Sequence, residues 1–364
     1  MRKAYTNGTI YTGKGVERNG TILTNGGIIE KIDNKAVSPE YQVIDLQGLN
    51  IAPSFIDLQI YGGDKKMFSS ELSIESLQAS YNYCKRGGAN HFMITMATNT
   101  IEKFLKGIEV VRAYWTGGGK GLLGLHLEGP YINPVKKGAH IAACIKRPTI
   151  KEVSMLLEKG RDVVKMMTLA PEQCDEAVIE LLIREGIIVS AGHTNATYEE
   201  GKNAFAKGIP AATHLFNAMS PFLHRAPGMV GAIYDHSSVM SSVVTDGVHV
   251  DFAAIRISKQ VMKERLFFIT DAVAEVLTGE YQHIFKGDRY TLPDGTLSGS
   301  SLTMMQSVIN GVREVGIELE EALRMASTYP ARLLGGNYKL GLIASGYEAS
   351  FVIFDNEMNV VVKE

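Results

Sequence analysis

Short apolar runs alternate with amphipathic stretches through the middle of the chain. Segments such as Ser73–Arg86 and Glu176–Glu185 mix apolar and charged residues at roughly helical spacing, which predicts helices. The apolar runs between such segments are short, and we interpret them as strands. There are eight of these runs: Ile51–Tyr61, Ala89–Thr98, Gly121–Pro130, Val163–Pro171, Ile187–His193, Ala211–Ala218, Val239–Asp246 and Arg265–Asp271.

Alternating strands and helices indicate a parallel sheet with right-handed crossovers. Eight such units fit closure into a (β/α)8 barrel, so we predict an α/β fold with a TIM-like barrel over residues 51–337. An open doubly wound sheet is the alternative. After the eighth strand, Thr278–Ser298, with its turn at Pro293-Asp294-Gly295, predicts a hairpin insertion followed by two last helices.

The two ends of the chain share a different pattern. The first part shows no helical period, only short β-rich runs broken by Asn-Gly pairs at 7–8 and 25–26, which are typical of hairpins. Near the other end, Phe351–Asp355 also has the pattern of a strand. Neither end has enough apolar surface for a core of its own. We therefore expect residues 1–50 and 338–364 to form one small β-sandwich domain beside the barrel.

The composition narrows the class of protein. The chain has 364 residues, with 37 Lys+Arg against 39 Asp+Glu, and this net charge of −2 excludes a generally basic nucleic-acid binder. With 45% hydrophobic and 21% charged residues, the chain is close to the globular norm, and global disorder is excluded. No apolar stretch approaches the roughly 18 residues that span a bilayer, and Met1–Gly20 has no apolar signal core. We expect a cytoplasmic protein with neither a nucleic-acid nor a membrane partner.

Four of the predicted strands end in residues that bind metals or transfer protons. Active sites of such barrels lie at the carboxyl ends of the strands. Glu128, His193 and His214 stand at three of these ends, and two imidazoles with one carboxylate suit a divalent metal that keeps a position open for water. Asp271 ends a fourth run, and such a carboxylate can take a proton from water and pass it to a leaving group. This combination indicates metal-assisted hydrolysis.

Each of these residues has a simpler explanation when it is taken alone. A single His at a strand end is more often a hydrogen-bonded structural residue, and Glu128 could be a cap or an ion-pair partner. Their coincidence at one rim of the barrel favours the site. His126 lies two residues before Glu128, on the same side of the strand, and we interpret it as a core or supporting residue. The sequence has no Gly-x-Ser-x-Gly motif, and none of its three cysteines has a convincing base partner, so covalent catalysis has little support.

Five segments, in order along nearly the whole chain, carry a resemblance to a known family. They are Pro53–Asp57, His126–Pro130, Ala191–Ala196, Thr213–Met219 and Thr270–Ala272. Together they resemble the N-acetylglucosamine-6-phosphate deacetylases of the amidohydrolase superfamily. The Gly-His and Thr-His pieces are weak signals by themselves, whereas the ordered set is highly specific.

The resemblance implies a reaction and roles for the site residues. The reaction would be hydrolysis of N-acetyl-D-glucosamine 6-phosphate to D-glucosamine 6-phosphate and acetate, a step in amino-sugar catabolism. Glu128, His193 and His214 would bind the metal, and Asp271 would act as general base and then as general acid. The segment Lys-Lys-Gly-Ala-His, which ends at His140, resembles an element of this family in which the His holds the amide carbonyl of the substrate. The resemblance therefore makes His140 the candidate for oxyanion stabilisation.

The resemblance also implies contacts to a phosphorylated amino sugar and a partner subunit. Ala139, Asn217, Ala218 and His249 would contact the substrate. Arg225 resembles a residue that reaches the phosphate from a neighbouring subunit, which implies a homodimer. A guanidinium fork suits a dianionic phosphate, so this role is chemically sensible.

The chain departs from the wider superfamily at the first barrel strand. Many amidohydrolases end this strand with His-x-His for a second metal, whereas here Gln59 and Tyr61 stand in place of the two histidines and are poor zinc ligands. We therefore expect one divalent metal ion per subunit, zinc first, with Fe, Co or Mn as alternatives. Two other hypotheses remain: an amidohydrolase that acts on a different acylated amino sugar or a cyclic amide, and a non-catalytic amidohydrolase-like scaffold.

Overall fold

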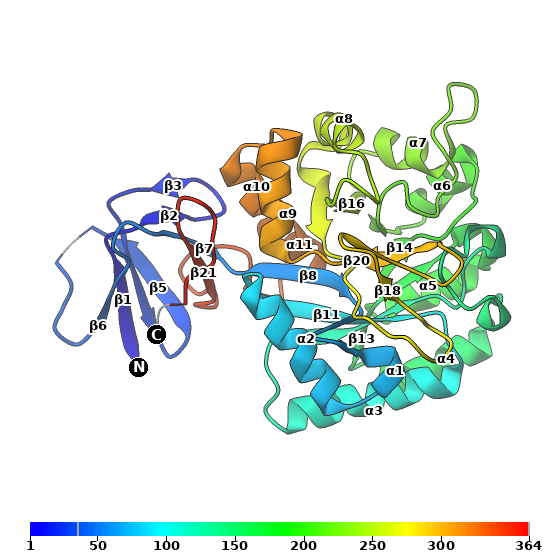
Figure 1. Ribbon diagram of the computed structural model, residues 1–364, viewed down its shortest axis with the longest axis horizontal. Coiled ribbons are helices and arrows are strands. Elements are labelled where there is room, and N and C mark those ends of the chain that lie inside the picture. Colours follow the sequence, from blue (N-terminus) through cyan, green and yellow to red (C-terminus); the bar gives the residue numbers. More distant parts are fainter. Residues whose placement is uncertain (35, 363–364) are drawn as a thin grey trace.

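An eight-stranded parallel sheet forms the centre of the computed structural model, which describes residues 1–34 and 36–362 (Figure 1). The strands follow one another around the sheet in chain order. The sheet nearly closes, because the Tyr61 N–H donates to the Ala272 carbonyl across 2.9 Å and the Asp271 N–H donates to the Gln59 carbonyl across 3.0 Å. The predicted barrel is confirmed, and the doubly wound alternative is wrong. The strands are β8 (Phe55–Ile60), β11 (Ala89–Ala97), β12 (Leu122–Glu128), β13 (Val164–Leu169), β14 (Ile188–Ala191), β15 (Ala211–Ala212), β16 (Met240–Val244) and β17 (Leu266–Ile269).

Amphipathic helices follow the barrel strands and cover their outer side (Figure 1). Several begin at a hydroxyl residue: the side chains of Ser73, Thr100 and Thr149 each accept a hydrogen bond from a backbone N–H in the first turn. The helices are α1 (Phe68–Glu71), α2 (Ile74–Arg86), α3 (Ile101–Thr116), α4 (Ile150–Gly160), α5 (Glu176–Arg184), α6 (Tyr198–Ala206), α7 (Gly228–Asp235), α8 (Phe252–Met262), α9 (Met304–Asn310), α10 (Leu319–Ala326) and α11 (Thr328–Leu334).

The segment after β17 differs in detail from its prediction. It forms a three-stranded antiparallel sheet of β18 (Ile284–Phe285), β19 (Arg289–Thr291) and β20 (Leu297–Ser300), with the predicted turn between β19 and β20. Three helices follow instead of two. A π-helical turn over Gly311–Val315 continues α9, and the left-handed conformation of Gly316, at φ 82°, ends it before α10 begins.

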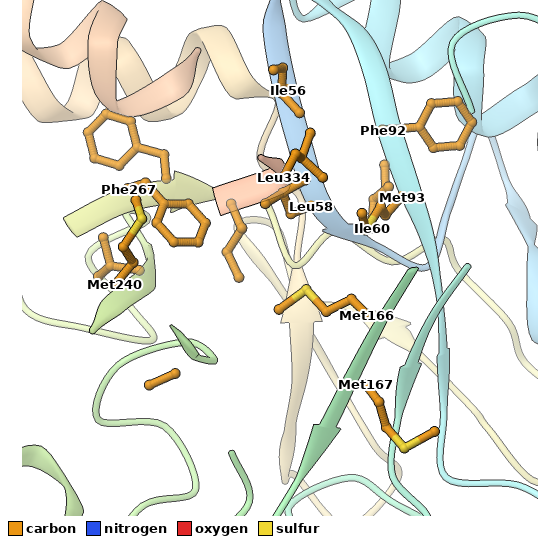
Figure 2. Close-up of a cluster of buried hydrophobic side chains, with 14 of the residues drawn as sticks. Ile56, Leu58, Ile60, Phe92, Met93, Met166, Met167, Met240, Phe267 and Leu334 are labelled. Carbon is orange, nitrogen blue, oxygen red and sulfur yellow. The ribbon is translucent and has the colours of Figure 1, made fainter. Parts of the chain in front are cut away.

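Side chains of the barrel strands alternate between two environments. Figure 2 shows Ile56, Leu58 and Ile60 of β8 packed in a large apolar cluster with side chains from other strands and from α11. The alternating residues Asp57 and Gln59 point to the opposite side of the strand, toward the barrel interior. The side chains of β8 that point into the barrel are therefore polar, while those on its outer side join the apolar core.

A layer of hydrogen-bonded polar side chains fills the barrel at the level of His126. His126 Nε2 lies 2.7 Å from Thr168 Oγ1, and Thr168 Oγ1 lies 2.7 Å from Thr213 Oγ1. Burial lowers the pKa of His126 to about 4, so this imidazole is neutral near pH 7. His126 is a satisfied core histidine, and this layer supports the strand ends that follow it.

Two four-stranded sheets drawn from both ends of the chain lie beside the barrel (Figure 1). The first has the order β5-β4-β1-β6 and the second β21-β7-β2-β3. They enclose an apolar cluster of Ile10, Ile22, Ile29, Leu46, Ile51, Ile343 and Ile353. The small β-sandwich is present, whereas its extent as a separate domain stays a prediction. The strands are β1 (Arg2–Thr6), β2 (Thr9–Tyr11), β3 (Val16–Glu17), β4 (Thr21–Asn25), β5 (Ile28–Asp33), β6 (Gln42–Asp45), β7 (Asn50–Pro53) and β21 (Phe351–Phe354).

Two local predictions need correction here. The run Ile51–Tyr61 is not one strand, because β7 pairs with β21 in the small sandwich and only β8 belongs to the barrel. The Asn25-Gly26 pair does join a hairpin, β4 to β5, but Asn7-Gly8 carries the chain from β1 in one sheet to β2 in the other. Only glycine fits at position 8 without a shift of its neighbours, since a Cβ there would lie 2.5 Å from Leu46 Cδ1.

Among the described residues, no helix is both long enough and apolar enough to cross a membrane. The three cysteines are free thiols, with Cys84 buried and the other two half-buried.

Candidate active site

A cavity of about 230 Å³ opens at the carboxyl end of the barrel. Larger hollows exist elsewhere on the described surface, but this cavity is the one that gathers carboxylates and imidazoles. Nine of the ten residues predicted for the site line it, and Arg225 does not. The lining residues are Tyr61, Glu128, Gly138, Ala139, His140, His193, His214, Asn217, Ala218, His249, Asp271, Thr296, Leu297, Ser298 and Gly299.

Three of the site residues have left-handed backbone conformations. The φ angles are 47° at His193, 37° at His214 and 54° at Asp271, and each residue lies two positions beyond the end of its strand. This conformation costs roughly 1–2 kcal/mol for a residue with a Cβ. The surrounding barrel holds the sharp turns, which bring these side chains to one cavity, and such strain is common at functional sites.

Glu128, His193 and His214 meet at one point. Glu128 Oε1 lies 3.0 Å from His214 Nε2 and 3.3 Å from His193 Nε2, and the two Nε2 atoms are 3.2 Å apart. Ligands on a tetrahedral metal with bonds of about 2.0–2.1 Å are separated by about 3.3 Å. The three atoms therefore have the mutual spacing of a metal coordination shell.

The electrostatics of this trio also fit a cation. His193 Nδ1 lies 2.8 Å from the Lys136 carbonyl, which can only accept, so Nδ1 carries a proton and Nε2 is the ring nitrogen that points toward Glu128. Burial by itself raises the pKa of Glu128, but the charge of His193 and hydrogen bonds from the surrounding imidazoles hold it well below its ordinary value. Burial lowers the pKa of His214, yet its hydrogen bond to Glu128 raises it above the ordinary value. A buried carboxylate that draws positive charge onto its neighbours is suited to hold a metal ion.

His140 lies beside this trio but presents a proton. Its Nδ1 accepts a hydrogen bond from the backbone N–H of Thr98 across 3.2 Å, and burial lowers its pKa to about 4. The neutral ring therefore carries its proton on Nε2, which lies 3.3 Å from Glu128 Oε2. Glu128, His140 and His193 are also close enough together to hold a metal. The tautomer of His140 favours His214 as the third ligand and leaves His140 as a hydrogen-bond donor.

Gln59 and Tyr61 act as donors to the acidic groups. Gln59 Nε2 lies 3.0 Å from Glu128 Oε1 and 2.8 Å from Asp271 Oδ1. The Tyr61 hydroxyl donates to Glu128 Oε2, and burial raises its pKa well above the ordinary value. The sequence marked both residues as poor ligands but not as partners of Glu128. Their positions at the end of the first barrel strand, near a predicted carboxylate, were the available signal.

Asp271 and His249 face each other across the cavity. Asp271 Oδ2 lies 3.8 Å from His249 Nε2, and burial raises the pKa of Asp271. His249 Nδ1 lies 2.6 Å from Asp246 Oδ2, so Asp246 fixes the ring with Nε2 toward the cavity. Sequence reasoning missed Asp246, although it ends a strand-like run three residues before His249.

Arg225 lies outside the cavity, on an exposed loop closed by hydrogen bonds between Leu223 and Ala226. It lines a separate surface hollow of about 510 Å³. Thr296–Gly299 of the insertion also line the candidate active-site cavity, which the sequence did not predict.

Comparisons with known proteins agree with this geometry. Residues 50–363 match the amidohydrolase family model. The chain is 37% identical to N-acetylglucosamine-6-phosphate deacetylase of Haemophilus influenzae, over 99% of this chain and 97% of that protein. It is 30% identical to N-acetylgalactosamine-6-phosphate deacetylase of a Shewanella species, over 90% of this chain and 84% of that protein. The crystal structure of N-acetylglucosamine-6-phosphate deacetylase from Pasteurella multocida has a TM-score of 0.95 at 36% identity, over 100% of this chain and 98% of that chain. The chain therefore belongs to the amidohydrolase family, within its group of N-acetylglucosamine-6-phosphate deacetylases.

Proposed function

We propose that the protein hydrolyses the acetamide of N-acetyl-D-glucosamine 6-phosphate and releases D-glucosamine 6-phosphate and acetate, as a step of amino-sugar catabolism. The observation that carries this proposal is the meeting of Glu128, His193 and His214 beside Asp271 and the neutral donor His140 in one cavity. Full-length relatives with this activity in their names support the choice of substrate.

Glu128, His193 and His214 would hold one divalent metal ion, zinc first, with Fe, Co or Mn as alternatives. When bound, such an ion acts as a Lewis acid that polarises a carbonyl and makes water more acidic. Gln59 and Tyr61 direct an N–H and an O–H toward the carboxylates. Because these groups donate hydrogen bonds instead of offering lone pairs to a second metal, they support one ion per subunit.

Asp271 carries the proton in this proposal. Gln59 holds Oδ1, so Oδ2 takes a proton from the attacking water as the new C–O bond forms. Burial raises the pKa of this carboxyl, which makes it a stronger base than an exposed aspartate. His140 Nε2–H donates to the carbonyl oxygen as negative charge develops there. Asp271 then gives the proton to the amide nitrogen while the C–N bond breaks, and the amine and acetate leave.

The substrate contacts and the oligomeric state belong to the same proposal. Ala139, Asn217, Ala218 and His249 line the cavity and would contact the sugar phosphate. Among the described residues that line the cavity, none is Lys or Arg, so a dianionic phosphate there lacks a permanent cation from its own chain. Arg225 of a second copy would supply that charge in a homodimer, since Arg225 lies exposed outside its own site.

The Shewanella relative favours one alternative substrate, N-acetyl-D-galactosamine 6-phosphate, which has the same acetamide and phosphate. The test is acetate release by the metal-replete protein from both phosphorylated sugars, from unphosphorylated N-acetylglucosamine, and with a chelator present. We expect chelator-sensitive turnover with a strong preference for the phosphorylated glucosamine derivative. Absence of release from all of them, with bound metal confirmed, would favour the scaffold hypothesis or a different amide. The cytoplasmic location stays a prediction.

A further inference from the structure

A second, smaller cavity adjoins the candidate active site on the side of His140. Its volume is about 40 Å³, and it shares Tyr61, Ala139, His140 and Ser298 with the larger cavity. These four residues line both cavities, so the small cavity lies directly beside the candidate catalytic groups. The proposed function leaves this space without a role.

The walls of the small cavity are mostly apolar. Met67, Ala97 and Val273 line it, and all three are buried members of one apolar cluster that is separate from the main core. The catalytic cavity, in contrast, is lined by carboxylates, imidazoles and an amide. The two adjoining cavities therefore differ in chemistry, and the smaller one suits an alkyl group.

Several polar side chains that line the small cavity have hydrogen-bond partners of their own. The Tyr281 hydroxyl donates to the Thr98 carbonyl across 2.7 Å. His283 Nδ1 lies 3.0 Å from Ser298 Oγ. Burial also lowers the pKa of His283 to about 4, so its ring is neutral near pH 7. These interactions leave the cavity without a fixed charge of its own, which again favours an apolar occupant.

The proposed reaction determines which part of the substrate lies there, and this inference rests on that reaction. The amide carbonyl carbon has three substituents in one plane: the oxygen, the nitrogen and the alkyl group. With the oxygen at His140 Nε2–H and the nitrogen at Asp271, the alkyl group points away from Asp271. The sugar follows the nitrogen toward Asn217 and His249, whereas the small cavity lies on the side of His140.

We propose that this cavity is the acyl pocket, which takes the methyl group of the substrate and limits the length of the acyl chain. A water molecule needs roughly 10–15 Å³ of such space, so the pocket holds about three water-sized groups. Acetyl places one carbon beyond the carbonyl carbon and propionyl places two, whereas hexanoyl places five. The pocket therefore admits the first two and excludes the third.

The test compares kcat/KM for the N-acetyl, N-propionyl and N-hexanoyl forms of glucosamine 6-phosphate. The wild-type protein is expected to cleave the first two and to cleave the hexanoyl form at least about 100-fold less efficiently, since one methylene in a tight pocket changes kcat/KM by about 10- to 200-fold. Val273→Ala widens the pocket and is expected to raise the hexanoyl-to-acetyl ratio about tenfold. Ala97→Leu fills the pocket and is expected to lower the propionyl-to-acetyl ratio about tenfold.

Val276→Ala is the matched control. Val276 packs against the same apolar cluster but does not line the small cavity, so the same truncation there is expected to leave both acyl ratios as in the wild type. Binding of glucosamine 6-phosphate, which has no acyl group, is expected to be the same in all variants. This measurement shows that each variant is folded and retains its sugar site.

The outcomes separate the two proposals. A hexanoyl-to-acetyl ratio that stays constant in Val273→Ala, with product binding intact, overturns the acyl pocket alone, and so does efficient cleavage of the hexanoyl form by the wild type. If Ala97→Leu fails to fold, Val273→Ala and the wild-type series decide. Failure of the wild type to cleave any of the three sugars overturns the proposed function and the acyl pocket with it.

Discussion

Gln59 donates a side-chain N–H to Asp271 Oδ1 across 2.8 Å, from the first strand of the barrel to the end of the last. This bond crosses the place where the sheet closes, and it assigns different roles to the two carboxylate oxygens. Oδ1 is held, while Oδ2 faces His249 and remains available to a proton. The geometry of barrel closure thus orients the group that the proposed reaction needs.

Asp271→Asn is expected to keep the fold and the metal but to lower kcat by about 10²–10⁴-fold, the range typical of a lost general acid–base group. The amide can still accept the bond from Gln59 through its oxygen, but it cannot take a proton from water. Acetate release, elemental analysis and circular dichroism on the same preparation check this expectation. Retained turnover would remove Asp271 from the mechanism.

His140 and His214 are expected to respond differently to the same substitution. His214→Asn removes one of three ligands, so the purified protein should lose its metal. His140→Asn should keep the metal and lower kcat by about 10²–10³-fold, because it removes a donor to the developing oxyanion. Metal content per chain distinguishes the two variants. Loss of metal in the His140 variant alone would show that the alternative trio binds the ion.

The number of metal ions is a separate prediction. Elemental analysis of the wild type is expected to give about one divalent ion per chain, because Gln59 and Tyr61 donate to Glu128 instead of offering lone pairs. Gln59→Leu should leave this ratio unchanged, since the variant loses only hydrogen bonds. Two ions in the wild type and one in the variant would contradict the single-ion site.

The in-trans role of Arg225 can be tested by mixing two inactive variants. Arg225→Ala and Asp271→Asn should each have low activity alone. After subunit exchange, a mixed dimer combines an intact Asp271 with an intact Arg225 from its partner, so about a quarter of all sites should recover in a symmetric dimer. Acetate release before and after exchange, with the mass in solution, provides the readout. A monomer with full activity on the phosphorylated sugar would rule out the role.

His283 is expected to make the protein less stable in acid. Burial lowers its pKa to about 4 in the folded state, against about 6.5 when unfolded. As the pH falls from 6.5 toward 4, the unfolded chain binds a proton that the folded chain does not, so the free energy of unfolding falls by up to about 3 kcal/mol.

Comparison with His283→Gln isolates this contribution from those of other buried histidines. Denaturant titrations of both proteins at several pH values should show a shallower pH dependence in the variant over this window. Parallel curves for the two proteins would mean that His283 titrates normally in the folded state.

The candidate site residues were visible in the sequence because each stands where an apolar run ends. Glu128, His193, His214 and Asp271 are far apart in the chain, yet a parallel barrel brings the carboxyl ends of all strands to one rim. The ordering of the residue types along the chain was therefore enough to predict both the fold and the cluster. The comparisons with known proteins confirm the family that the sequence motifs resemble.

The features that sequence reasoning missed depend on contacts between distant segments. β7 and β8 are buried on both faces, so no alternation of polar and apolar residues marks the break between them. The wall formed by Thr296–Gly299 depends on where the insertion folds back, and local pattern carries no such information. The tautomer of His140 likewise follows from Thr98, which lies 42 positions earlier in the chain.

The pairing of β7 with β21 has a consequence for biosynthesis. Asn50 lies opposite Phe354, about 300 positions later in the chain. A ribosome adds about 5–20 residues per second, so β7 waits roughly 15–60 s for its partner strand to be made. During that interval the apolar side chains of the first strands have no complete core to enter. The nascent chain thus carries an open edge at β7 until β21 has been synthesised, and an unpaired strand edge favours aggregation during that interval.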